Sequence, residues 1–369
     1  MRVLFLADTD SPHTLKWAKS LIKTNVEVGI FTLHTPNMDL YSDEPEIVIE
    51  SLNASRELQS KKETNIGKLI YFKSFHEVRK VIKKFNPDIV HSHYASSYGL
   101  VGALSNFHPY LISVWGSDIY SFPRYSNIYK KVLNYSLNKA DLILATSNSL
   151  MLETKKYCNK TIDLIPFGID TSKFVSKRFD SLFSTDDIVI GTIKTLEKNY
   201  RIEYLIKAFH ILSAKYSNIS LKLLIVGKGT QREVLEKLVQ KLGIKDKTIF
   251  AGFIHPDDIP KYHNMLDIFV AVSEEESFGV AVLESCACEK PVVVSNVGGF
   301  PEVVTNNETG LIVEKNNIIS IVNSLEKLIL NPDLRKRMGK NGRQKVISQY
   351  DWEESVKKML TVYRSFTYE

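Results

Sequence analysis

Residues 276–284 read E-S-F-G-V-A-V-L-E, and they decide what the second half of the chain is expected to form. The apolar run at 280–283 does not alternate with polar residues and follows Gly279, which is typical of a helix that starts near Phe278, after a strand and a loop. Glu276 lies before the expected helix, and Glu284 lies about two turns into it. Because the first turn of a helix presents unpaired N–H groups and the positive end of the dipole, this segment suits a phosphate.

The two glutamates suit the two ends of a larger ligand. A carboxylate accepts two hydrogen bonds at once, which fits the vicinal hydroxyls of a sugar or a ribose. Gly279 allows a ligand to approach the backbone, and Ser277 and Phe278 lie in the same turn. The pattern indicates a nucleotide-sugar site, and the alternative interpretation is a capped core helix with two surface acids.

The sequence after this segment makes the pattern more specific. Pro291 opens a buried apolar run, residues 298–302 read G-G-F-P-E, and Gly310 opens a further apolar run. From Ser273 to Gly310 this order of residues resembles the retaining glycosyltransferases of family 4, and the resemblance extends more loosely over nearly the whole chain. It implies an α/β fold of the GT-B type, with two facing Rossmann-like domains, parallel sheets and a C-terminal crossover helix.

Strand-like runs alternate with helix-like segments along the chain, as in parallel sheets that are covered on both faces. We expect an acceptor-binding domain at residues 1–170, joined by the last helix at about 351–369. A nucleotide-sugar-binding domain is expected at residues 185–350. Within the first domain we expect residues 68–72 to form a strand and residues 75–85 to form a helix.

The composition is that of an ordinary globular protein. The chain has 369 residues, more than one hydrophobic core usually holds, with 44% hydrophobic and 24% charged residues. No apolar run approaches the ~20 residues that span a bilayer. The three cysteines lack a C-x-x-C spacing and the nine histidines are scattered, so we expect no disulfide framework, no metal site and a cytoplasmic location. The net charge of +6 is shared by both halves, and no nucleic-acid partner is expected.

The start of the second domain offers cations for a diphosphate. Residues 191–201 read G-T-I-K-T-L-E-K-N-Y-R. The resemblance places phosphate-neutralising cations in this loop, where Lys194 and Lys198 are the nearest matches and Arg201 is the reserve. A leaving diphosphate gains charge, so fixed cations lower its energy. Gly227 follows a strand and opens a helix, which places it at the edge of the same site.

The loop after the first strand has a different character. It reads D-T-D at 8–10, which is the metal-binding signature of the other large glycosyltransferase fold, yet we expect no metal role because it leads directly into a helix. It also lacks the glycines of a dinucleotide-binding loop, which argues against an NAD enzyme. Ser11 and His13 are candidate acceptor-site or cleft residues, and a capping role for His13 is the alternative.

Two further strand ends carry candidate residues. Trp115 and Asp118 follow one strand, and ligands bind outside the carboxyl ends of strands in such sheets. Many family 4 members have a histidine where Trp115 stands, and the resemblance gives that histidine a contact with the donor sugar. A tryptophan can still stack on a sugar face. His93, at the end of the preceding strand, is the nearest substitute, and we expect His91 to point to the opposite side.

Two basic segments have the composition of a surface. The expected helix at 75–85 has one apolar stripe and a basic opposite side, which is usually a solvated face but also fits anionic lipid. Residues 122–135 interleave aromatic and basic side chains, which suits a lipid interface or a carbohydrate platform. Ordinary packing is the alternative for the second segment.

Together the residues and the resemblance predict retaining, metal-independent transfer of a sugar from a nucleoside diphosphate sugar to an acceptor hydroxyl. The acceptor is expected to be a carbohydrate or lipid-linked, in cell-surface polysaccharide, lipid-linked oligosaccharide or glycolipid synthesis, with peripheral contact to the inner face of an anionic membrane. We expect no cofactor, a UDP-sugar rather than a GDP-sugar as donor, and Glu276, His93 and Lys198 as catalytic groups. The alternatives are a non-catalytic nucleotide-sugar-binding partner of another transferase and a nucleotide-sugar epimerase.

Overall fold

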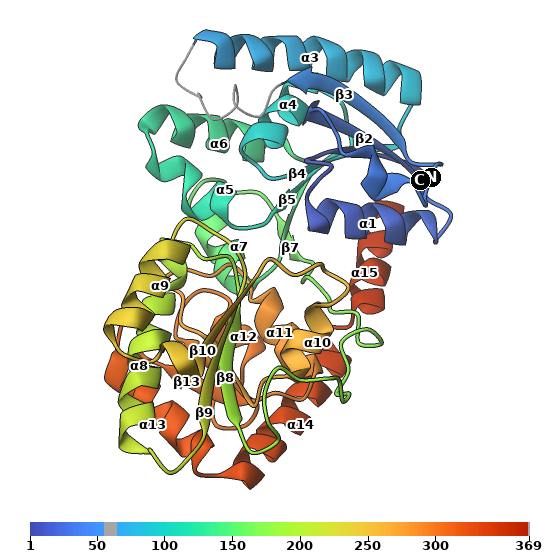
Figure 1. The fold of residues 1–369 in the computed structure, drawn as a ribbon. Helices are drawn as coiled ribbons and strands as arrows, with labels where there is room; N and C mark the ends of the chain where they lie inside the picture. The colour runs from blue at the N-terminus through green and yellow to red at the C-terminus, as the bar shows by residue number, and fades with distance from the viewer. Residues whose placement is uncertain (55–64, 368–369) are drawn as a thin grey trace. The chain divides into compact units, whose positions relative to one another are not determined.

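The chain forms two compact α/β units in a computed structural model that describes residues 1–54 and 65–367 (Figure 1). The first unit comprises Met1–Pro166 together with Val356–Glu369, and the second comprises Phe167–Ser355. The boundary between the units therefore passes through the last helix, α15 (Trp352–Arg364).

Parallel strands form the central layer of the first unit. Over the described residues its sheet has seven strands in the order β3-β2-β1-β4-β5-β6-β7. The strands are β1 (Arg2–Leu6), β2 (Glu27–His34), β3 (Val48–Ala54), β4 (Ile89–His93), β5 (Tyr110–Val114), β6 (Leu142–Ala145) and β7 (Ile162–Leu164). The chain moves from β1 outward to β3 and then returns to the other side of β1, so the strand order reverses between β1 and β4.

Helices cover both faces of this sheet. They are α1 (Pro12–Ile22), α3 (Asn65–Phe85), α4 (Ser97–Ser105), α5 (Ser117–Tyr120), α6 (Asn127–Lys139) and α7 (Asn148–Thr154), with short 3-10 turns η1 (Met38–Tyr41) and η2 (Phe122–Arg124). On one face α3, α4 and α6 pack on Leu4 and Leu6 of β1. On the opposite face the end of α15 is held by a buried hydrogen bond of 2.7 Å between the Tyr363 hydroxyl and His91 Nδ1.

The second unit repeats the plan. Among the residues that the structure describes, its sheet has six parallel strands in the order β10-β9-β8-β11-β12-β13. The strands are β8 (Ile188–Ile193), β9 (Leu221–Val226), β10 (Thr248–Gly252), β11 (Ile268–Ala271), β12 (Val292–Ser295) and β13 (Gly310–Val313). Here the strand order reverses between β8 and β11.

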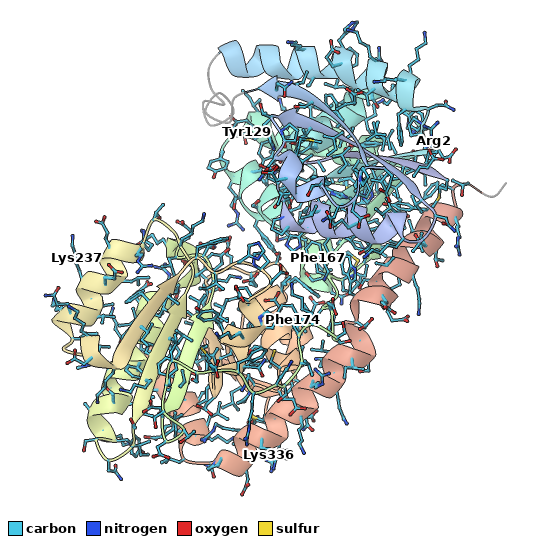
Figure 2. All side chains as sticks on the ribbon, turned by 45° about the vertical axis from the view of Figure 1, so that its right-hand side comes forward. Arg2, Tyr129, Phe167, Phe174, Lys237 and Lys336 are labelled. Carbon is cyan, nitrogen blue, oxygen red and sulfur yellow. The ribbon has the colours of Figure 1, made fainter. Side chains whose placement is uncertain are left out.

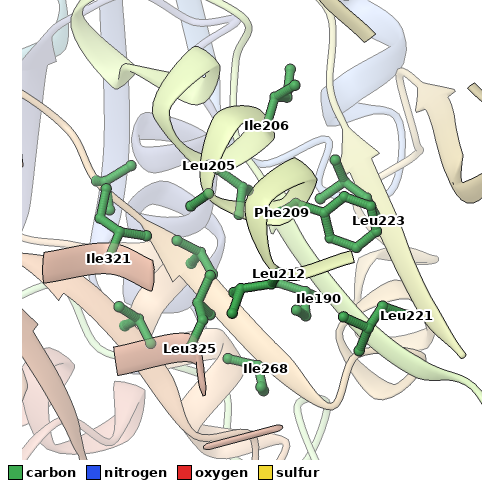
Figure 3. Packing of buried hydrophobic residues seen from close by; sticks show 14 of the residues in the cluster. Ile190, Leu205, Ile206, Phe209, Leu212, Leu221, Leu223, Ile268, Ile321 and Leu325 are labelled. Atoms are coloured by element: carbon green, nitrogen blue, oxygen red, sulfur yellow. The ribbon is translucent and has the colours of Figure 1, made fainter. Parts of the chain in front are cut away.

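The helices of this unit pack on both faces of its sheet (Figure 1). They are α8 (Ile202–Lys215), α9 (Arg232–Lys241), α10 (Ile259–Asn264), α11 (Val280–Ala287), α12 (Phe300–Val303), α13 (Ile318–Ile329) and α14 (Pro332–Gln349), with 3-10 turns η3 (Lys198–Tyr200) and η4 (Lys245–Lys247). Figure 3 shows the core under α8 and α13, where Phe209 and Leu212 meet Leu325 and the strand residue Ile190. Full burial of these apolar side chains anchors the strands whose ends carry the candidate site.

The prediction of parallel α/β sheets in both halves is confirmed, and one predicted element is wrong. Residues 68–72, expected to form a strand, belong to helix α3. A short apolar run has no clear period of its own, so it fits a helix as well as a strand. The edge strand β3 was not expected, because its sequence, V-I-E-S-L-N-A, lacks a regular alternation.

None of the helices within residues 1–54 and 65–367 has both the length and the apolar content that membrane crossing requires.

Tyr363→Phe is expected to lower the free energy of unfolding of the first unit by about 1–3 kcal/mol, because His91 Nδ1 loses its buried partner. Denaturant unfolding, followed by hydrogen exchange of β4, measures the loss. Tyr125→Phe is the matched control, since that side chain is 71% exposed. Equal stability of the two variants would show that the Tyr363–His91 bond does not hold α15 in place.

Candidate functional site

The reversal of strand order locates the first candidate site, in the second unit. In open parallel sheets ligands bind beyond the carboxyl ends of the strands at the point of reversal. The strands concerned are β8 and β11, which are followed directly by Lys194 and by the loop that carries Glu276. Two residues that the sequence analysis assigned to the donor are thus brought together at this edge.

Lys194 and Glu276 form an ion pair. The distance from Lys194 Nζ to Glu276 Oε2 is 2.6 Å, and the two side chains are 16% and 11% exposed. The ammonium group also lies 4.5 Å from the centre of the Tyr200 ring. The pair is therefore largely removed from bulk water while still reachable by a ligand.

The electrostatics of Lys194 show that both glutamates act on it. Burial alone disfavours its charged form, but the carboxylate of Glu276, the Tyr200 hydroxyl and the carboxylate of Glu284 outweigh burial and raise the pKa of Lys194. Lys194 is accordingly a permanent cation at neutral pH. The site combines one fixed positive charge with two carboxylates within its electrostatic reach.

Two glycines allow the loops of this site to pack closely. Gly298 has a φ of +51°, and a Cβ there would overlap the carbonyl oxygen of Glu276. Gly227 has a φ of +137°, and a Cβ there would overlap the carbonyl oxygen of Lys194. Both positions combine a backbone conformation that favours glycine with a close approach, so both halves of the ion pair depend on a neighbouring glycine.

Glu284 has a buried partner. His263 Nε2 lies 3.3 Å from Glu284 Oε2, and the His263 side chain is fully buried against Phe174 and Phe269. Nδ1 of His263 has no hydrogen-bond partner among the described residues. Since its ring is fixed by packing, His263 fixes the direction of the Glu284 carboxylate, which remains 20% exposed.

Residues 277–279 lead into helix α11, which carries Glu284. The helix begins at Val280, and Gly279, with a φ of +111°, is its N-cap. Phe278 is buried against Phe167 and Tyr350, so its side chain serves packing and only its backbone lies near the helix start. Ser277 is partly exposed.

The other two candidate cations lie differently. Lys198 is exposed on η3. Arg201 is partly buried and forms ion pairs with Glu274 and Glu203, and its Nε has no hydrogen-bond partner among the described residues. Arg201 thus ties η3 to the loop that carries Glu276, whereas Lys198 is not engaged in this network.

The first unit has a second group of residues at its own reversal point, between β1 and β4. His93 is 1% exposed, and its Nδ1 lies 3.3 Å from the Thr14 hydroxyl. Its ring lies 4.5 Å from the centre of Trp115, which also contacts the partly exposed His13 at 5.6 Å. The structure thus brings His13, His93 and Trp115 together, and Trp115, at 6% exposure, is buried like His93.

Burial keeps this histidine cluster uncharged. It is the largest cause that lowers the pKa of His13 to about 4 and of His91 to about 3, and it holds the pKa of His93 well below its usual value. The expectation that His91 points away from His93 is wrong. Residues two apart in a strand share a face, and the two rings lie 5.0 Å apart.

Asp118 and Ser11, two predicted cleft residues, lie next to backbone groups of the loops that follow the strands. Asp118 is 1% exposed, and its carboxylate accepts hydrogen bonds from the backbone N–H groups of Ala95, Trp115 and Gly116. It therefore joins the loops that follow β4 and β5. Ser11 occupies the N-cap position of α1, where its side chain makes no capping hydrogen bond.

The two carboxylates of the D-T-D loop are engaged in hydrogen bonds with nearby residues. Asp8 Oδ1 lies 2.6 Å from His34 Nε2 and accepts a bond from the backbone N–H of Asp10. Asp10 Oδ1 accepts bonds from the Thr9 hydroxyl and the Asn37 backbone. Over residues 1–54 and 65–367, no three histidine, cysteine or carboxylate side chains are grouped so that they could hold a metal ion.

Comparison with known proteins identifies the family. Residues 2–147 match the family model described as Glycosyl transferase 4-like, and residues 174–345 match the model described as Glycosyl transferases group 1. The structure of sucrose-phosphate synthase from Thermosynechococcus elongatus superposes with a TM-score of 0.84 at 21% identity, covering 100% of this chain and 99% of that chain. The chain belongs to the GT-B glycosyltransferases of the family 4 type.

Relatives of this glycosyltransferase carry names that describe different products or pathways. N-acetyl-alpha-D-glucosaminyl L-malate synthase from Bacillus anthracis is 27% identical over 78% of this chain and 77% of the relative. The capsular polysaccharide biosynthesis glycosyltransferase CapM from Staphylococcus aureus is 33% identical over 55% of this chain and 52% of the relative. The Anabaena protein Alr3699/HepE, solved in complex with UDP, superposes with a TM-score of 0.80 at 17% identity, covering 99% and 100% of the two chains.

Sequence reasoning missed two residues of the candidate site. His263 lies within a short helix next to apolar residues, and nothing in its local pattern indicates that it reaches Glu284 on another helix. Tyr200 reads as one more aromatic in a charged loop. Its contact with Lys194 depends on how η3 folds back, which is a tertiary feature.

Gly298→Ala is expected to lower the melting temperature by several degrees and to weaken donor binding, because the new methyl group must displace the backbone of Glu276. Gly243→Ala is the matched control. Gly243 also has a positive φ, of +68°, but a Cβ there meets nothing within 4 Å, so this variant bears only the backbone cost of about 1 kcal/mol. Equal losses in the two variants would show that the close approach to Glu276 is irrelevant.

His91→Asn is expected to make stability less sensitive to acid. The folded protein holds the pKa of His91 at about 3, while the unfolded chain protonates near 6.5, so the wild type loses stability as the pH falls through this window. Between pH 5.5 and 4.5 the free energy of unfolding should fall by about 1.4 kcal/mol less in the variant than in the wild type. Urea unfolding at both pH values measures this difference, and parallel pH dependences would contradict it.

Proposed function

We propose that the chain transfers a sugar from a nucleoside diphosphate sugar to an acceptor hydroxyl, with retention of configuration at the anomeric carbon. The observation that carries the proposal is the Lys194–Glu276 ion pair at the point where the strand order reverses. A fixed cation beside a partly exposed carboxylate matches a ligand that has a diphosphate next to a polyhydroxyl ring.

Each residue of the site receives a role in this proposal. Glu284, oriented by His263, binds the ribose hydroxyls, and Glu276 binds the donor sugar. Lys194 and the N–H groups at the start of α11 stabilise the diphosphate, with Lys198 and Arg201 as further cations of the same loop. These positive groups offset the charge of the leaving diphosphate, so the reaction needs no divalent metal. The first unit binds the acceptor.

The chemistry is a substitution at the anomeric carbon. The bond between this carbon and the phosphate oxygen breaks, and the nucleoside diphosphate leaves with the bonding electrons. The acceptor oxygen forms the new bond on the same face, and its proton passes to the departing phosphate oxygen. Because negative charge grows on the diphosphate in the transition state, a cation fixed in advance is the main contribution that the protein makes.

The ion pair also explains how donor binding prepares Glu276. Without a ligand, the Glu276 carboxylate is satisfied by Lys194 at 2.6 Å. A diphosphate that approaches Lys194 offers several charged oxygens to the ammonium group and so competes with Glu276 for its N–H donors. The Glu276 oxygens are then available to accept hydrogen bonds from the sugar hydroxyls.

The names of the relatives suggest a nucleoside diphosphate sugar as donor and include both UDP and GDP donors. The Anabaena protein has been solved with UDP-glucose, while a relative from Mycobacterium tuberculosis is described as a GDP-mannose-dependent phosphatidylinositol monomannoside mannosyltransferase. We propose a UDP-sugar as donor. A carbohydrate or lipid-linked acceptor is proposed because relatives act in capsular polysaccharide and phosphatidylinositol mannoside synthesis.

One observation favours a second function, a protein that binds a nucleotide sugar without transferring it. His93, the expected substitute for the usual family histidine, is buried in contact with Trp115, which is buried as well. Thermal shift with a panel of nucleoside diphosphate sugars measures binding, because a ligand of the native state raises the melting temperature. Binding without release of free nucleotide would favour this second function, and a new sugar isomer would indicate an epimerase.

Glu276→Ala is expected to lower the rate of sugar transfer roughly 100-fold or more, because it removes a contact with the reacting sugar and leaves Lys194 without its partner. Release of nucleotide from a UDP-sugar measures the rate. Glu276→Gln separates charge from shape, and Glu233→Ala, on the exposed side of α9, is the matched control. Unchanged transfer in both Glu276 variants would defeat the assignment.

A further inference from the structure

Helix α6 of the first unit has apolar and basic residues on its outer side. Ile128 is 71% exposed and Tyr135 is 41% exposed. With Lys131 and Lys139 these residues follow a helical spacing, so they form one continuous stripe on the side opposite Leu133 and Leu137, which are buried. The stripe of Ile128, Lys131, Tyr135 and Lys139 is called the outer stripe of α6.

The residues before the helix extend this surface. Tyr125 is 71% exposed, and its ring leans on Tyr129 with the ring centres 6.3 Å apart. Tyr129, which is labelled in Figure 2, packs in turn on Phe122 at 4.9 Å. The exposed Tyr125 is thus supported by other aromatic rings, and together with Tyr135 it gives this segment two exposed tyrosines.

The charge of this segment has a single sign. From Arg124 to Lys139 the sequence contains four cations and no aspartate or glutamate. Lys130 and Lys131 are exposed and have no ion-pair partner among the described residues. A surface that joins exposed Ile and Tyr side chains with unpaired lysines complements a layer that is anionic at its surface and apolar beneath.

Helix α3, the other basic helix of this unit, provides the contrast. Among residues 73–85 of this helix, Val78 and Phe85 are buried in the core, and the exposed side chains are those of lysine, arginine and histidine. Of these, Lys80 and Lys84 are paired with Glu77 and Glu50. The described part of α3 is therefore a solvated face, and α6 is the helix that presents apolar groups together with unpaired positive charge.

The position of α6 connects this surface to the acceptor side of the unit. Trp115 follows β5 at the carboxyl edge of the sheet, and the chain continues through α5 and η2 directly into Tyr125 and α6. Since η2 packs against both α5 and α6, the start of the outer stripe lies at the same edge as Trp115. A lipid-linked acceptor would then be met where it leaves the bilayer.

We propose that the outer stripe of α6, together with Tyr125 and Lys130, binds the surface of a bilayer that contains anionic phospholipids. Only the biological role of this binding, access to a lipid-linked acceptor, rests on the proposed function. Binding itself requires only exposed apolar groups and positive charge.

Co-sedimentation of the whole chain with vesicles tests the proposal. Vesicles of phosphatidylcholine alone are compared with vesicles that also contain about a third phosphatidylglycerol. We expect binding to the anionic vesicles only, and weaker binding at high salt because screening reduces the attraction to the lysines. Equal binding to both vesicle types, or no binding to either, would overturn the proposal without the use of any variant.

A matched pair of double variants locates the surface. Lys130→Gln with Lys131→Gln is expected to lower the vesicle partition coefficient by about tenfold or more. Lys80→Gln with Lys83→Gln removes the same charge from α3 and should change it less than twofold. Equal losses in the two pairs would mean that only net charge matters, which contradicts a specific surface on α6.

Ile128→Glu tests the apolar part of the surface and the other occupants. It should abolish vesicle binding while transfer to a soluble acceptor continues, since Ile128 lies outside the proposed site. If the variant instead separates a dimer of the chain and leaves vesicle binding unchanged, a second copy covers this face and the proposal fails. Loss of vesicle binding with intact transfer supports the membrane surface. The loss of transfer in Glu276→Ala is measured without vesicles. The membrane proposal and the proposed function can therefore fail independently of each other.

Discussion

The interaction on which the site depends is the ion pair between Lys194 and Glu276. A partly buried ion pair adds little net stability, because the loss of hydration offsets most of the attraction. Its value lies instead in holding two opposite charges at the carboxyl edge of β8 and β11 before any ligand arrives. The surrounding features follow from this requirement: Gly298 and Gly227 let the two loops approach, and Arg201 ties the loops to each other.

Much of this arrangement could be predicted from the sequence, and the limit is set by contacts between distant segments. The helix after Gly279 and the neighbouring strands β11 and β12 follow from apolar runs and turn residues, which are local signals. That Lys194 meets Glu276 requires the strand order, which no local pattern contains. The short run at 68–72 was assigned wrongly because four or five apolar residues fit a strand and a helix equally well.

The first unit shows how burial changes the meaning of a residue type. Three histidines near the carboxyl edge of a sheet look like acid–base groups in the sequence, since histidine titrates near neutrality. In the structure they contact Phe5, Trp115 and Tyr363, and burial keeps all three uncharged at neutral pH. The Asp118 carboxylate similarly accepts hydrogen bonds from backbone N–H groups. Sequence position indicated the correct edge of the sheet, whereas the exposure of each side chain is decided by packing.

The contrast between α3 and α6 follows from the same distinction. Both helices combine apolar and basic residues, so their amphipathic character alone cannot tell which one faces a partner. The two helices differ in which apolar residues are buried against the sheet. Val78 and Phe85 of α3 are buried, whereas on α6 only Leu133 and Leu137 face the core and Ile128 is exposed to water. Exposed isoleucine and tyrosine side chains beside lysines without ion-pair partners in the described part of the chain complement a surface that is anionic outside and apolar beneath. The surface on α6 lies at the same edge of the sheet as Trp115. Binding of a membrane there would therefore also bring a lipid-linked acceptor to the proposed acceptor side of the unit.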